Sequence, residues 1–133
     1  MEKIKEFFGQ KDAFAKKCGI ELLQVGPGTA KASVKLKPDH LNGVGIAHGG
    51  IIFTLADYVF AAASNSHGTV AVAINANISY LKAAKEGVLT ATAREVSCGR
   101  KIACYTIDVA DRNNEIIAVF QGMVFRKDAP LMQ

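Results

Sequence analysis

Residues 30 to 37 alternate between apolar and polar side chains, and a lysine or serine follows each of Ala30, Ala32, Val34 and Leu36. A period of two residues is typical of a strand that buries one face. A second strand-like run spans residues 19 to 25, and the turn residues Gly26-Pro27-Gly28 separate the two runs. Together these segments predict a half-buried hairpin.

Four further strands are predicted in the C-terminal half, over residues 69–81, 88–97, 102–110 and 115–126. Turn-forming residues separate them at Lys85-Glu86-Gly87, Cys98-Gly99-Arg100 and Arg112-Asn113-Asn114. Because short turns join strands that run in opposite directions, we expect an antiparallel meander. Residues 128–133 are predicted to form a loose tail.

Two segments have helical patterns. Residues 2–18 carry lysines in their last turn, Gly19 follows as a cap, and apolar side chains recur at helical spacing at Ile4, Phe7, Phe8, Phe14 and Cys18. This pattern predicts one amphipathic helix. Residues 49–63 are apolar on nearly every side, which is typical of a buried helix.

A flat sheet covers only one side of such a helix. The sequence therefore predicts an α+β architecture in which a curved antiparallel sheet of about six strands wraps around the central helix, with an additional N-terminal helix. Exposed strand edges and the apolar helix favour pairing with a second copy of the chain.

The composition fits one domain over residues 1–133. The chain has 133 residues, of which 50% are hydrophobic and 21% charged, and a core of this size needs no disulfide or structural metal. Cys18, Cys98 and Cys104 are interpreted as reduced thiols, the last two as buried small hydrophobes. The charged N-terminus and the lack of a long apolar run predict a cytoplasmic protein that does not enter membranes.

The net charge of +4 would suit nucleic acid, a membrane surface or a phosphorylated small molecule. The lysines are scattered, no basic run is interleaved with aromatic residues, and tryptophan is absent. These features argue against nucleic-acid binding.

Asp57 is the strongest candidate for chemistry, because it lies in the middle of the apolar helix. An ionised carboxylate there costs several kcal/mol unless it is paired or used. A desolvated carboxylate is fit for general-base or nucleophilic work. The alternative is that Asp57 lies on an exposed strip or pairs with a lysine.

The segment before this helix, His40 to Gly50, contains four glycines in eight positions, 43 to 50. They would let the backbone approach a ligand, and the free amides of the helix start could bind an oxyanion. The spacing does not match a dinucleotide fingerprint or a phosphate-binding loop. A plain tight turn is the alternative.

His48 and Asp57 are nine residues apart, which is about 13 Å along a helix and half a turn around it. One chain cannot easily bring them together. A shared site would therefore lie at a dimer interface, where Asp57 meets the His48-Gly49 turn of the other copy.

Other chemistries have weaker support. His40, His48, His67 and Asp57 include no pair at metal-ligand spacing, so we expect no metal and no cofactor. A serine hydrolase would need a nucleophile elbow that is absent, and helix capping is the expected role of Ser64 and Ser66.

The run His40-x-Asn42-x-x-Gly45-x-x-His48-Gly49-Gly50, followed by Leu55-Ala56-Asp57, resembles the signature of hotdog-fold acyl-CoA thioesterases of the phenylacetic-acid-degradation (PaaI-like) type. The resemblance covers residues 18 to 127. It implies hydrolysis of an acyl-CoA thioester at a dimer-interface site, usually within a homotetramer.

The same resemblance implies residue roles. Asp57 would be the general base or nucleophile, and the Gly49 amide would polarise the thioester carbonyl with help from Asn42. His48 would shape the turn. The acyl group, aryl or medium-chain, would lie near Gly50, Phe53, Thr54 and Tyr58.

In some relatives a serine or threonine on the strand after the central helix orients the attacking water. The matching position here is Ala73, and Asn75 is a candidate substitute that could equally face solvent. The nucleotide end of coenzyme A would lie near Tyr80, Lys82, Gly99, Arg100 and Lys101.

Two other functions remain open. A hotdog dehydratase fits less well, because Asp57 would need a histidine as its acid-base partner. A non-catalytic acyl-CoA-binding or regulatory module would keep the pocket and tolerate the loss of Asp57.

Overall fold

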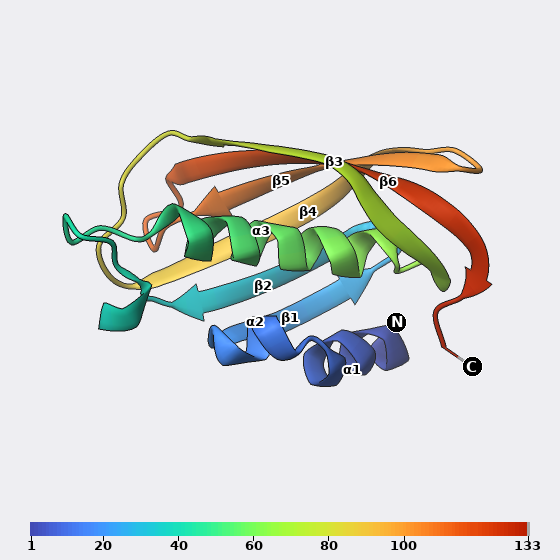
Figure 1. Ribbon diagram of the computed structural model, residues 1–133, viewed down its shortest axis with the longest axis horizontal. Helices are drawn as coiled ribbons and strands as arrows, with labels where there is room; N and C mark the ends of the chain where they lie inside the picture. Colours follow the sequence, from blue (N-terminus) through green and yellow to red (C-terminus); the bar gives the residue numbers. More distant parts are fainter. Residues whose placement is uncertain (133) are drawn as a thin grey trace.

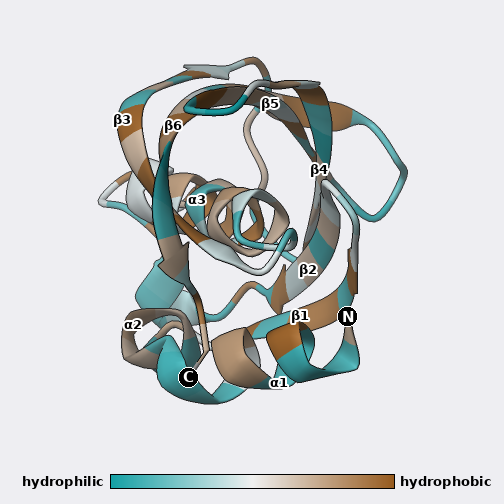
Figure 2. Ribbon diagram, turned by 90° about the vertical axis from the view of Figure 1, so that its right-hand side faces the viewer, coloured by the Kyte–Doolittle hydropathy of each residue, from teal (hydrophilic) through white to brown (hydrophobic). Residues whose placement is uncertain are grey.

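The computed structural model describes residues 1–132, in which one curved antiparallel sheet wraps around helix α3 (Gly49–Ser64) (Figure 1). The six strands are arranged in the order β1-β2-β4-β5-β6-β3. Their bounds are β1 (Ile20–Gly26), β2 (Thr29–Lys35), β3 (Thr69–Tyr80), β4 (Val88–Cys98), β5 (Ile102–Ala110) and β6 (Ile116–Pro130). Viewed along α3, the sheet curves around the helix from β1 to β3 (Figure 2). The predicted α+β hotdog architecture is confirmed.

The predicted meander was wrong at β3. Three hairpins form as expected within residues 1–132, β1–β2, β4–β5 and β5–β6, but β3 pairs with β6 and β4 pairs with β2. The chain after β3 crosses over the start of α3 instead of turning back beside it. The alternation within a strand identifies its buried face but not its neighbours, so it could not predict this crossing.

The C-terminal tail was also predicted to begin too early. β6 continues to Pro130, which lies opposite Thr69 in the sheet. Residues 128–130 therefore belong to the sheet, and Gln133 lies outside the described residues.

The N-terminal segment forms two helices, α1 (Glu2–Lys11) and α2 (Ala13–Lys17), where the sequence predicted one. Asp12 leaves the helical conformation, and its carboxylate accepts a hydrogen bond from the Ala15 N–H at 3.1 Å. Acidic side chains stabilise helix starts in this way. The break changes the phase of α2, so that Phe14 is 66% exposed although it was expected on the apolar face. Gly19 follows α2 with φ of 79°, as its predicted cap role requires.

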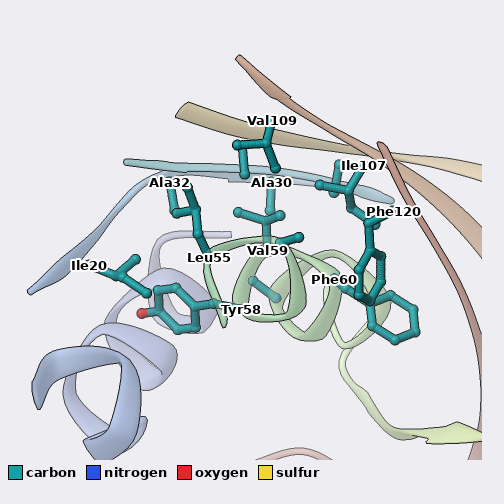
Figure 3. Close-up of a cluster of buried hydrophobic side chains, with 14 of the residues drawn as sticks. Ile20, Ala30, Ala32, Leu55, Tyr58, Val59, Phe60, Ile107, Val109 and Phe120 are labelled. Atoms are coloured by element: carbon teal, nitrogen blue, oxygen red, sulfur yellow. The ribbon is translucent and has the colours of Figure 1, made fainter. Parts of the chain in front are cut away.

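The core lies between α3 and the concave face of the sheet. Leu55 and Val59 of α3 pack under β2 and β5, and Phe60 contacts Tyr105 and Phe120 with ring centroids 5.9 and 5.5 Å apart (Figure 3). Full burial of such side chains contributes roughly 1.5–3 kcal/mol each.

Two buried polar side chains fix the end of α3. The Asn65 side-chain oxygen accepts a bond from the Ala71 N–H at 2.9 Å, and its amide donates to the Ala61 carbonyl at 2.8 Å. The Ser66 hydroxyl accepts from Gly28 N–H and donates to the Ala63 carbonyl. The capping role predicted for Ser66 is thus confirmed, and Ser64 likewise donates to the Ala61 carbonyl at 3.3 Å.

The cysteines are free, as predicted, but Cys98 is exposed and Cys18 and Cys104 are half-buried. The prediction of buried Cys98 and Cys104 was wrong. The β4–β5 hairpin extends past the end of α3 (Figure 1). In the alternating burial of β5, Cys104 lies on the convex side of the sheet. Within residues 1–132, no helix combines the length and apolar character needed to cross a membrane.

Candidate active site

The loop before α3 is organised by Asn42. Its side-chain oxygen accepts hydrogen bonds from the N–H groups of Val44 and Ile46, at 3.0 and 3.3 Å. Gly45, with φ of 82°, completes the turn. Because the side-chain oxygen is occupied, the Asn42 amide nitrogen is the group available to a ligand, and it has no hydrogen-bond acceptor within residues 1–132.

His48 is the N-cap residue of α3. Its Nδ1 accepts a hydrogen bond from the Gly50 N–H at 2.8 Å, which satisfies one of the free amides of the first turn. The N–H of Gly49, the residue before Gly50, has no acceptor among the described residues. The helix start therefore presents one free donor at its positive end.

Tyr80, at the end of β3, lies against this first turn. Its hydroxyl donates to the Gly49 carbonyl at 3.1 Å, and a Cβ atom at position 49 would lie 3.2 Å from the ring. A side chain at position 49 would therefore crowd the Tyr80 ring, which would have to shift by a few tenths of an ångström. Asn42, Gly49, Tyr80, Leu81 and Lys82 line a depression of about 340 Å³, which we call the Tyr80 groove.

Asp57 lies on the stripe of α3 that the sheet leaves partly uncovered, together with Gly50, Thr54 and Ala61. Its side chain is half-buried, between the desolvated and the exposed position that the sequence left open. Burial raises the pKa of Asp57 above its ordinary value of 3.8, and the negative charge of Asp12 adds to this effect. No hydrogen-bond or ion-pair partner of its carboxylate is present in the described part of the chain. Asp57 is therefore available to a substrate or to a second chain.

Gly49 and Asp57 lie on the same helix, eight residues apart, which is about 12 Å along its axis. One chain does not bring the free amide and the carboxylate to the same point. The outer edge of β3 has no neighbouring strand within residues 1–132, and its Val72 and Ile74 are 39% and 53% exposed. This edge and the uncovered stripe of α3 are the surfaces that a second copy could cover.

The residues expected near the acyl group are in three different environments. Tyr58 is 4% exposed, and its hydroxyl donates to the Phe8 carbonyl at 2.9 Å, so it ties α3 to α1. Phe53 packs edge to face on Phe120, with ring centroids 5.3 Å apart. Thr54 remains at the surface of α3, beside Gly50, whose carbonyl accepts its hydroxyl proton.

Asn75 lies on the convex face of the sheet. It pairs with Met123, whereas the adjacent Gly122 lies on the concave side against Phe60. Asn75 therefore points away from α3 and from Asp57 of its own chain. Ala73, opposite Val124, is on the concave side, and an irregularity between Ala73 and Asn75 causes the change of face.

The residues expected to bind the nucleotide lie at two ends of the sheet. Tyr80 and Lys82 are beside the start of α3, and Lys82 is paired with Asp111 and Glu115. Gly99, Arg100 and Lys101 form the β4–β5 turn at the opposite end, where Arg126 donates to the Gly99 carbonyl at 2.8 Å (Figure 1). A nucleotide site that uses both groups needs more than one chain.

A polar cluster at the far end of α3 was not predicted. Glu95 accepts hydrogen bonds from the Tyr105 hydroxyl at 2.6 Å and from His67 at 2.7 Å. Cys98 also lies near, and one donor atom from each of His67, Glu95 and Cys98 falls within 4.8 Å of the others. These residues are far apart in sequence and carry no motif, so only the fold reveals them.

Comparison with known proteins agrees with this geometry. The family model of the thioesterase superfamily matches residues 44–118. A protein of Archaeoglobus fulgidus, whose name assigns it provisionally to the esterases, is 42% identical over 95% of this chain and 82% of its own. The acyl-coenzyme A thioesterase PaaI of Escherichia coli is 36% identical over 88% of this chain and 84% of its own.

Solved structures show the same fold. The structure of E. coli PaaI, a protein from the phenylacetic acid degradation operon, matches with a TM-score of 0.93 and 32% identity, covering 97% of this chain and 94% of that one. A Streptococcus mutans protein solved with bound acetyl CoA matches with a TM-score of 0.79 and 28% identity, covering 84% and 90%. From its sequence, its sheet wrapped around α3 and these matches, the chain belongs to the thioesterase superfamily.

Proposed function

We propose that this protein is an acyl-CoA thioesterase that hydrolyses its substrate to a free acid and coenzyme A, with Asp57 as the reacting carboxylate. The observation that carries this proposal is the half-buried Asp57 carboxylate, which has a raised pKa and no protein partner in residues 1–132, on the uncovered stripe of α3. The E. coli relative is named an acyl-CoA thioesterase, and the S. mutans neighbour holds acetyl CoA, which supports a CoA ester as substrate.

In this mechanism the thioester carbonyl accepts a hydrogen bond from the Gly49 N–H, assisted by the Asn42 amide. The negative charge that develops on the oxygen is stabilised there and by the positive end of α3. Asp57 of a second copy removes a proton from water as the water oxygen bonds to the carbonyl carbon. The C–S bond then breaks, and the released thiolate takes up a proton.

Asp57 can alternatively attack the carbonyl carbon itself, giving an anhydride that water then hydrolyses. Both routes use the same residues. A thiol has a pKa of about 8.5, so it leaves with little help from an acid. One carboxylate and one set of oxyanion donors therefore suffice.

The site needs two copies, because Gly49 and Asp57 are about 12 Å apart on one helix. We therefore propose a homodimer with two equivalent sites, and dimers that pair into a tetramer. His48 fixes the first turn by capping Gly50. The enzyme is proposed to act in the cytoplasm.

A second candidate function is acyl-CoA binding without turnover. The position of Asn75 favours it, because Ala73 has no hydroxyl and Asn75 faces away from α3, so its own chain offers no obvious group to orient water.

Measuring free-thiol release from a panel of aryl and alkyl acyl-CoA esters separates these functions. We expect Asp57→Asn to lower kcat/KM by about 100-fold or more, as the loss of a general base does. Asp108→Asn on β5, on the face of the sheet away from α3, is the matched control and should retain activity. Equal rates in wild type and Asp57→Asn would refute the proposed role. Ligand-induced stabilisation of the wild type without thiol release would support the binding module.

A further inference from the structure

Two depressions flank the start of α3. The Tyr80 groove lies on one side. On the other side, between α2 and the first two turns of α3, lies a groove of about 270 Å³, which we call the Phe14 groove after the residue at its outer wall. The two grooves meet at the first turn, where Gly49 lines one and Gly50 lines the other.

The Phe14 groove has apolar walls, formed chiefly by Phe14, Cys18 and Ile51. Its polar side chains are His40 and Thr54, both hydrogen-bonded within the chain, and the exposed Asp39 and His48. The Lys37 N–H donates to Nδ1 of His40 at 3.0 Å, so Nε2 carries the proton and donates to the Cys18 carbonyl at 2.8 Å. The Thr54 hydroxyl donates to the Gly50 carbonyl at 2.7 Å, so its proton is not available to a ligand.

Helix α2, which forms the outer wall of the Phe14 groove, is held in place. The bond between His40 and the Cys18 carbonyl anchors the end of α2, and the Asp12 side chain caps its start. Phe14 stays 66% exposed on this anchored helix. A phenyl ring fixed beside an apolar groove is suited to contact an apolar ligand.

The two grooves differ in chemistry in the way that the two arms of a thioester differ. A carbonyl held at the Gly49 N–H would direct one arm into each groove. The Tyr80 groove contains the free amide nitrogen of Asn42, the Tyr80 hydroxyl oxygen and the Lys82 ammonium, which is shared with Asp111 and Glu115. These polar groups suit the amides of the pantetheine arm. The surface of the Phe14 groove is more strongly apolar than that of the Tyr80 groove.

We infer that the acyl arm of the substrate lies in the Phe14 groove, with Phe14 selecting compact apolar acyl groups. This inference rests on the proposed acyl-CoA substrate. An apolar cavity of about 150 Å³ holds one benzene molecule. In proportion, the Phe14 groove fits an acyl group of about ten carbon atoms, either alkyl or aryl. The uncovered stripe of α3 continues from Thr54 to Asp57, where the groove meets the surface that a second copy would cover.

The test measures binding in an Asp57→Asn background, where turnover does not consume the ligand. Dissociation constants for octanoyl-CoA and acetyl-CoA are determined by calorimetry for Asp57→Asn alone and combined with Phe14→Ala. Because Phe14 is exposed, its removal should not unfold the protein, which thermal unfolding verifies. Phe125→Ala, a partly exposed phenylalanine on the convex face, is the matched control.

We expect Phe14→Ala to weaken octanoyl-CoA binding about tenfold and acetyl-CoA binding less than twofold, since only the longer chain reaches the ring. Thr54→Phe, which fills the groove, should likewise exclude octanoyl-CoA while acetyl-CoA still binds. Equal effects on the two ligands, no effect on either, or no binding of octanoyl-CoA to Asp57→Asn would overturn the inference. Selective loss of octanoyl-CoA binding in a protein whose wild type releases no thiol would keep the inference and reject the hydrolase function.

Discussion

At the scale of single residues, the proposed chemistry rests on Asp57 and Gly49, whose surroundings are set by their neighbours. The His48 side chain caps Gly50, the Gly49 N–H has no acceptor within residues 1–132, and the Tyr80 ring would be crowded by a side chain at position 49. The sequence predicted these positions because a carboxylate within an apolar helix and glycines at its start can be recognised without knowledge of the fold. It could not predict that the Tyr58 hydroxyl bonds to the Phe8 carbonyl of α1 or that Asn75 faces away from α3, because both depend on contacts with distant segments.

Asp57 should cost stability at neutral pH. A carboxyl group whose pKa is raised in the folded protein contributes its full stability below its ordinary pKa of 3.8 and loses it as the pH rises through the folded-state value. Asp57→Asn removes the charge that burial disfavours. We expect the variant to unfold a few degrees above the wild type at pH 7, with the difference vanishing below pH 3.8.

Thermal unfolding of both proteins across this pH range checks the expectation. A lower Tm for Asp57→Asn at pH 7 would mean that the carboxylate has a stabilising partner in the assembled protein. The expected result, a variant that is more stable but less active than the wild type, is common at functional sites.

At the scale of elements, the hydrophobic pattern does not determine where a helix begins or which way its side chains face. Capping side chains and turns determine both. The apolar spacing of residues 2–18 continues through Asp12, yet this residue caps a new helix, because a side chain that bonds to the Ala15 N–H ends one helix and begins another. The new phase of α2 turns Phe14 toward the groove beside α3, where the acyl arm is inferred to bind. The strand bounds were predicted closely for β5, whose alternation is strict.

The cluster around Glu95 links β4, β5 and the end of α3. Burial raises the pKa of Glu95, but hydrogen bonds from Tyr105 and His67 outweigh it and lower the pKa below 4.5. A lowered carboxyl pKa contributes stability above the unfolded-state value, and this stability is lost as the pH falls through the folded-state value. Glu95→Gln should therefore destabilise the protein at pH 7, and the difference from wild type should shrink as the pH falls below 4.5 and through the lower folded-state value.

Urea unfolding at pH 7 and at pH 3.5 measures this effect. Glu21→Gln, at an exposed position on β1, serves as the control and should be nearly neutral at both values. A Glu95→Gln variant as stable as wild type at pH 7 would show that the cluster contributes nothing to the fold.

At the scale of the whole molecule, the sequence predicted a sheet wrapped around one helix because a helix that is apolar on all sides must be covered on all sides. It did not predict that β3 crosses to the edge beyond β6. That crossing leaves the outer edge of β3 and the Asp57 stripe of α3 uncovered, so the fold itself provides the surfaces for a second copy. The proposed site would be completed only by such an assembly.

The central claim is that each site combines Gly49 of one chain with Asp57 of another. Complementation between two inactive variants tests it most directly: Asp57→Asn is mixed with Gly49→Val, whose side chain collides with Tyr80 and displaces the first turn of α3. The mixture is unfolded and refolded so that the chains exchange, and thiol release is measured.

A mixed dimer would hold one site with both lesions and one with neither. Random pairing makes half of the dimers mixed, so the account predicts recovery of about one quarter of wild-type activity from two inactive proteins. If mixed dimers form, as tagged chains would reveal, and activity stays at the level of the separate variants, the shared site is contradicted.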